Sequence, residues 1–136
     1  MSDVQYNTNL AAEFYVLSVL HRLGVDATLT LGNKKAVDIA VIKAAGSALT
    51  IDVKGLAGTT SWPVDNVKES KDRHFLVFVC FGGRIIDPAY QPEVWVVPSA
   101  ALGPFVYRAP SGRRVVPRST LRKAAGPYKD AWKLLQ

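Results

Sequence analysis

Polar and apolar positions near the start of the chain recur with a helical period. Residues 9–23 contain neither glycine nor proline, Thr8 and Asn9 are residue types that begin helices, and Gly24 is typical of a helix end. The pattern predicts a helix over 9–23, and at about 100° per residue Glu13 lies at the centre of its apolar face. Because a carboxylate facing a core is costly unless a cation or hydrogen-bond donors meet it, Glu13 is a candidate functional residue.

The pattern then changes to the two-residue period of strands. It predicts a three-strand meander from residues 27–31, 36–43 and 48–54, with a tight hairpin loop between the last two. Residues 75–81 are apolar on both faces, which is typical of a strand buried from two sides, and 93–97 is its predicted partner. We therefore expect an α/β fold with a mixed central sheet flanked by helices.

Shorter elements are predicted in the remaining segments. Residues 99–104 suit a short helical turn, and 105–107 and 113–116 suit extended edge segments. Between the third strand and the buried strand, only 65–72 could be helical. Pro127 suits the first turn of a C-terminal helix, whose apolar stripe would comprise Tyr128, Ala131, Trp132 and Leu135. The 136 residues are expected to form one domain, 1–136.

Counting through the hairpin brings two aspartates together. If residues 44–46 form the loop, Lys43 faces Ser47, and Asp38 falls directly opposite Asp52. Like charges directly opposite each other destabilise a sheet, so this register favours a cation between the two carboxylates. Their hard oxygen ligands suit Mg²⁺ or Mn²⁺. The inference holds only for odd loop lengths, since a shift of one residue turns one side chain to the other face.

Strand alternation adds a lysine to this pair. Thr50, Asp52 and Lys54 share one face of the third strand, and Ile51 and Val53 lie on the other. A lysine two residues after a metal-binding acid can orient or help deprotonate an attacking water, and it can stabilise charge developing on a phosphate. The alternative is that these residues form strand ends and exposed ion pairs.

Three segments, in this order, resemble the PD-(D/E)XK nuclease superfamily. They are the helix with Glu13, then KAVDIAV at 35–41 and LTIDVKG at 49–55. The resemblance covers about residues 9–97, and the ending PYKDAWKLL is similar to the terminal helix of small stand-alone members. It implies a restriction endonuclease-like core of order αβββ(α)ββ followed by a C-terminal helix.

The resemblance also implies a chemistry. A divalent metal, Mg²⁺ or Mn²⁺, would be held by Asp38 and Asp52 with the Val53 carbonyl and Glu13 assisting, and Lys54 would position the nucleophilic water. The expected function is a metal-dependent DNA endonuclease that leaves a 5′-phosphate. The alternative is a non-catalytic nucleic-acid-binding or interaction module with the same fold. A homodimer would supply two copies of the site for two DNA strands.

The sequence departs from the family's pattern in two positions. Val37 stands where the motif has proline, and Asp52 stands where glutamate is commoner. The shorter acid reduces the reach toward a metal by one methylene.

Positive charge is concentrated in the last segment of the chain. Residues 1–105 have a net charge of −1, whereas 106–136 have eight Lys/Arg and a net charge of +7. Such a cluster is typical of phosphate-backbone binding, although a solvated surface explains many of them. Trp62 suits base stacking or, equally, a lid on the core. The candidate nucleic-acid contacts are Lys34, Lys35, Thr59, Thr60, Trp62, Arg113, Arg114, Arg118, Arg122 and Lys123.

The sequence also bears on the location of the protein and on its cysteine and histidine residues. The apolar runs are shorter than the roughly 20 residues that a membrane span needs, and the first residues lack the features of a signal peptide. We therefore expect a cytoplasmic protein without a membrane partner. Cys80 lies in an apolar strand and is expected to be buried, and both His21 and His74 are expected to be packed or dipole-facing rather than catalytic.

Overall fold

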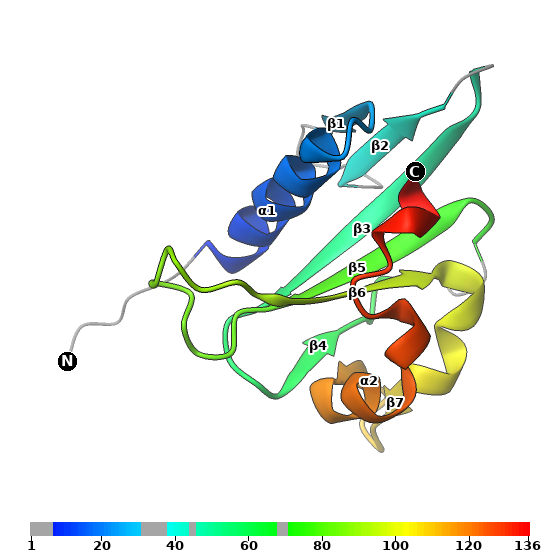
Figure 1. Cartoon of the computed structure of the whole chain (residues 1–136). Helices are drawn as coiled ribbons and strands as arrows, with labels where there is room; N and C mark the ends of the chain where they lie inside the picture. The colour runs from blue at the N-terminus through cyan, green and yellow to red at the C-terminus, as the bar shows by residue number, and fades with distance from the viewer. Residues whose placement is uncertain (1–6, 31–37, 44–45, 68–70) are drawn as a thin grey trace.

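The computed structural model describes residues 7–30, 38–43, 46–67 and 71–136 (Figure 1). Its main element is a five-stranded sheet of order β1-β2-β3-β5-β6. The pairs β1–β2, β2–β3 and β5–β6 are antiparallel and β3–β5 is parallel, so the predicted mixed sheet and its meander are confirmed. The bounds are α1 Thr8–Arg22, β1 Ala27–Leu29, β2 Ile39–Ile42, β3 Ala48–Leu56, β5 His74–Cys80 and β6 Glu93–Pro98.

A second, three-stranded sheet has the order β4-β8-β7. Its strands are β4 Ser61–Pro63, β7 Tyr107–Arg108 and β8 Arg114–Pro117, and the helix α2 spans Arg118–Ala124. Figure 1 shows α1 on one side of the large sheet, and β4, β7 and α2 gathered on the other. None of the described helices is long and apolar enough to cross a membrane.

The two faces of the large sheet are buried in two separate cores. On the helix face, Val16 and Leu20 of α1 pack with Ile51 and Val53 of β3. On the small-sheet face, the core includes Trp62, Leu76, Phe78, Cys80, Val116 and Leu121. The strand β5 contributes to both cores, which explains why its sequence is apolar at nearly every position.

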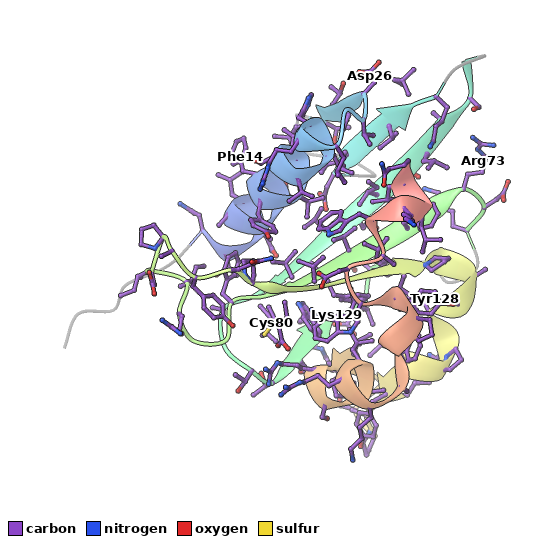
Figure 2. The ribbon with its side chains drawn as sticks, in the orientation of Figure 1. Phe14, Asp26, Arg73, Cys80, Tyr128 and Lys129 are labelled. Atoms are coloured by element: carbon purple, nitrogen blue, oxygen red, sulfur yellow. The ribbon has the colours of Figure 1, made fainter. Side chains whose placement is uncertain are left out.

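Cys80 lies on the small-sheet face (Figure 2). Its side chain is buried, as the sequence predicted, and Sγ donates a hydrogen bond to the Gly58 carbonyl at 3.2 Å. Burial raises the pKa of this thiol. A buried thiol with a raised pKa is a poor nucleophile, so Cys80 is a packing residue.

The first half of α1 lies directly against the end of β3. A Cβ added at Gly55 would meet the Thr8 carbonyl oxygen at 2.8 Å and the Ala12 Cβ at 3.1 Å. A side chain would therefore push the helix away from the strand, and glycine permits the close approach. As a result, the beginning of α1 packs directly on the end of β3.

One prediction of secondary structure is wrong. The segment around Pro127 forms two short 3₁₀ helices, η4 Gly126–Tyr128 and η5 Trp132–Leu135, because Asp130 between them has a positive φ of 52° that interrupts any α-helix. Of the possible helix at 65–72, residues 68–70 lie outside the described residues, and 65–66 and 72 are turns. The extended segments expected at 105–107 and 113–116 overlap β7 and β8, whereas β4, the pairing of the three strands into one sheet and α2 were not predicted from the sequence.

Candidate functional site

The predicted register of the hairpin is confirmed. Ile39 pairs with Ile51 and Ile42 with Ala48, and the Lys43 N–H donates to the Ser47 carbonyl at 2.7 Å. Residues 44–45 of the predicted loop lie outside the described residues. Asp38 lies one position before β2. Continued by one residue, this register places the Asp38 backbone opposite that of Asp52 on the neighbouring strand.

The Asp38 carboxylate lies beside the edge of β3, just before the point where β2 begins at Ile39. Its Oδ2 accepts a hydrogen bond from the Val53 N–H at 2.7 Å. Two residues further along β3, the Gly55 N–H donates to Oδ1 of Asn9 at 3.2 Å. In an extended strand the N–H and C=O of one residue point to the same side, so the Val53 carbonyl is directed to this edge as well. Asp38 therefore lies beside the peptide that joins Asp52 to Val53.

Asp52 points to the small-sheet face, and its side chain is 21% exposed. Its Oδ2 is 3.3 Å from Nε2 of His74, whose Nδ1 is 2.7 Å from the Thr50 hydroxyl. His74 is 4% exposed and is the first residue of β5. The sequence predicted a packed histidine but not its contact with Asp52. This contact depends on the parallel register of β3 and β5, which pairs Thr50 with His74 and which no local sequence signal specifies.

Lys54 lies at the wall of a surface pocket of about 200 Å³. The pocket extends from Asn9 and Gly55, at the edge just described, to Asp65 and Asn66 beyond β4. Lys54 is half-buried and shares its face of β3 with Asp52. The strand thus places the second acid and the lysine on one face, and of the two the lysine lines the pocket.

Glu13 is buried in the apolar face of α1, as the helical phase predicted, and is 6% exposed. Tyr15 and Val19 line a pocket with Gln91 and Trp132 on the β6 side of the helix. By helical phase, Glu13 lies on the opposite flank of the buried stripe. It is on the helix face of the sheet, whereas Asp52 lies on the small-sheet face.

The three acids do not form one compact cluster. Within the described ranges, no group of three or more His, Cys, Asp or Glu side chains is placed to hold a metal ion. The backbone register nevertheless makes Asp38 and Asp52 neighbours, with the Val53 carbonyl beside them, so the chain offers two carboxylates and one neutral oxygen as candidate ligands. This donor set fits Mg²⁺, which commonly binds through one or two carboxylates and completes its shell with water and substrate phosphate. The donor set of Asp38, Asp52 and the Val53 carbonyl fits a two-carboxylate site, and the assisting role of Glu13 stays a prediction.

The loop between β3 and β4, together with the start of β4, contains three predicted nucleic-acid contacts. Thr59 and Thr60 are exposed. Trp62, however, is fully buried, its Nε1 donates to the Val79 carbonyl at 3.2 Å, and its ring packs edge-on against Phe78 with centroids 5.2 Å apart. Base stacking by Trp62 is therefore wrong, and the alternative, a core side chain, is correct.

All four arginines predicted to contact nucleic acid bind groups within the protein. The Arg113 guanidinium binds Asp65 at 3.1 Å, and that of Arg114 donates to the Val67 carbonyl at 3.1 Å. Arg118 and Arg122 both bind Glu93, at 2.7 Å and 3.6 Å. The hydrogen bond to Glu93 raises the pKa of Arg118 further.

Exposure separates these cations into two groups. The Arg118 side chain is only 19% exposed and serves the fold, whereas those of Arg113 and Arg122 are 62% and 56% exposed. Lys123 is exposed as well. Lys34 and Lys35 lie outside the described residues.

Comparison with protein-family models, curated proteins and solved structures finds no match to the chain. Its function is therefore inferred from the residues of the site.

Proposed function

We propose that the protein is a Mg²⁺-dependent endonuclease with a restriction endonuclease-like core, which hydrolyses DNA phosphodiester bonds at the open edge of β3. The hydrogen bond from the Val53 N–H to Asp38 Oδ2, at 2.7 Å, is the observation that carries this proposal. It keeps the first acid beside the peptide of the second acid. Lys54, two residues after Asp52, borders the pocket that adjoins this edge.

Asp38 and Asp52, with the Val53 carbonyl, would hold the ion. When bound, the ion would polarise the phosphate and lower the pKa of an attacking water. The Val53 N–H restricts rotation of the Asp38 carboxylate, so one of the two acids is oriented before any ligand binds. Glu13 would add negative charge from the helix face, where its burial keeps that charge poorly screened.

Lys54 would act on the substrate. Its ammonium group, at the wall of the pocket, would orient the attacking water and offset negative charge that develops on the phosphate. The exposed hydroxyl groups of Thr59 and Thr60, in the loop that follows β3, would contact flanking phosphates.

A cleavage assay tests the proposal. Linear, single-stranded and branched DNA are incubated with the protein in Mg²⁺, in Mn²⁺ or in EDTA, and the products are tested for a 5′-phosphate by ligation. We expect cleavage only with the metals, and a loss of about 100-fold or more in Asp52→Asn and Lys54→Met. Asp26→Asn is the matched control, because Asp26 lies at the other end of α1, near β1 and away from the proposed site (Figure 2).

A non-catalytic DNA-binding module is the second candidate. The absence of a three-acid group among the described residues favours it. Such a module would bind DNA in a salt-dependent manner, and Asp52→Asn would leave its affinity unchanged. Binding without cleavage of any substrate, with or without metal, would overturn the nuclease proposal in favour of this one.

A further inference from the structure

His74 is a buried polar side chain between two residues of the neighbouring strand β3. Its ring nitrogens lie 2.7 Å from the Thr50 hydroxyl and 3.3 Å from Asp52 Oδ2. The parallel register places Thr50 beside His74 and Asp52 two residues further along. Both contacts lie on the face of the sheet that also carries Lys54, which lines the pocket.

The chemistry of the three groups determines the direction of these hydrogen bonds. An ionised carboxylate only accepts, so the contact with Asp52 is a hydrogen bond when Nε2 of His74 carries the proton. In the neutral ring Nδ1 is then an acceptor, and the Thr50 hydroxyl donates to it. The two contacts therefore select one tautomer, in which Thr50 orients the ring and the ring binds the acid.

We infer that His74 is a positioning residue that holds Asp52 Oδ2 and so presents Asp52 Oδ1 to the divalent cation. This inference rests on the proposed function. Asp52 would then bind the ion through one oxygen, in an orientation that the buried ring maintains. A carboxylate without this partner would sample other rotamers and would bind the ion more weakly.

The first experiment measures Mn²⁺ binding without DNA, by calorimetry, in the folded protein. We expect His74→Ala to weaken Mn²⁺ binding by about 10- to 100-fold. His74→Gln, whose amide can still donate to Asp52, should recover part of that affinity. Thr50→Val keeps the size and β-branching of the side chain but removes the hydroxyl, and it should cause a smaller loss. A purely structural role would lower stability in all three variants and leave the affinity of the folded fraction unchanged.

The second experiment determines the tautomer in the wild-type protein, without metal. Long-range ¹H–¹⁵N spectra at pH 8 report which ring nitrogen carries the proton. We expect the Nε2–H tautomer for His74, and a shift of its resonances on addition of Mg²⁺ that is absent in Asp52→Asn.

The outcomes separate the two proposals. The Nδ1–H tautomer, or wild-type Mn²⁺ affinity in His74→Ala, would overturn the role of His74 and leave the nuclease proposal standing. A wild-type protein that binds no Mn²⁺ would overturn the metal site itself, and with it the positioning role.

Discussion

The Val53 N–H donates a 2.7 Å hydrogen bond to the carboxylate of Asp38, fifteen residues earlier in the chain. The bond lies beyond the Ile39 end of β2, where β3 continues without a paired strand residue, so Asp38 satisfies a strand N–H that would otherwise lack its ladder partner. The first acid of the proposed site therefore also stabilises the fold, and substitutions can separate the two roles.

Asp38→Asn keeps an oxygen that can accept from Val53, whereas Asp38→Ala removes it. We expect Asp38→Ala to lower the free energy of unfolding by about 1–3 kcal/mol and Asp38→Asn by less, as measured by urea denaturation. Both should abolish metal-dependent cleavage, because both remove the negative charge. If the two substitutions destabilise equally, the charge of Asp38 and not its hydrogen bond supports the fold.

Trp62 is predicted to contribute to stability and not to DNA affinity. Its ring is fully buried against Phe78 and Trp95, so Trp62→Ala should lower the free energy of unfolding by about 3–5 kcal/mol. Trp62→Phe keeps much of the packing and should cost less. Under conditions in which the variants are folded, DNA affinity measured by fluorescence anisotropy should match that of the wild type. A drop in affinity without a drop in stability would restore the stacking interpretation.

Local patterns allowed part of this fold to be predicted, and long-range pairing explains what was missed. The helix α1 and the β2–β3 register follow from periodicity and from a loop that sets Lys43 opposite Ser47. The pairing of β4 with β8 joins segments about fifty residues apart, and no sequence period reports it. The contact of His74 with Asp52 likewise depends on the pairing of β3 with β5, which no sequence period predicts. The orientation of Glu13 was predictable from helical phase, but its separation from Asp52 by the sheet required the three-dimensional arrangement.

DNA binding, if it uses the C-terminal cations, should depend on the exposed ones. Arg122→Gln with Lys123→Gln should weaken binding and reduce the slope of log affinity against log salt concentration by about 0.9 for each phosphate that is no longer neutralised. Lys133→Gln, which removes an exposed charge elsewhere, is the matched control. Arg118→Gln should mainly lower stability, since Arg118 binds Glu93 at 2.7 Å. An unchanged salt slope in the double variant would exclude these two residues as phosphate-binding residues.

Asp65 should make stability depend on pH at the acidic end. The Arg114 backbone N–H, at 2.8 Å, and then the Arg113 guanidinium hold the pKa of Asp65 below its ordinary value of 3.8. Because the folded-state pKa is the lower one, the stabilisation is present above 3.8 and is lost as the pH falls through the folded-state pKa. The difference in unfolding free energy between wild type and Asp65→Asn should therefore be constant from neutral pH to about pH 5 and shrink below that.

Urea denaturation at several pH values measures this difference. Arg113→Gln is the informative control, because it removes the exposed ion pair and leaves the Arg114 N–H in place. The pH dependence should become weaker in this variant but persist, since the backbone hydrogen bond is the larger cause of the lowered pKa. A difference between wild type and Asp65→Asn that does not change between about pH 7 and pH 2.5 would contradict the lowered pKa of Asp65, since the unfolded-state carboxyl takes up its proton near pH 3.8 while the folded-state carboxyl stays ionised to lower pH, which must reduce the stabilisation over that range.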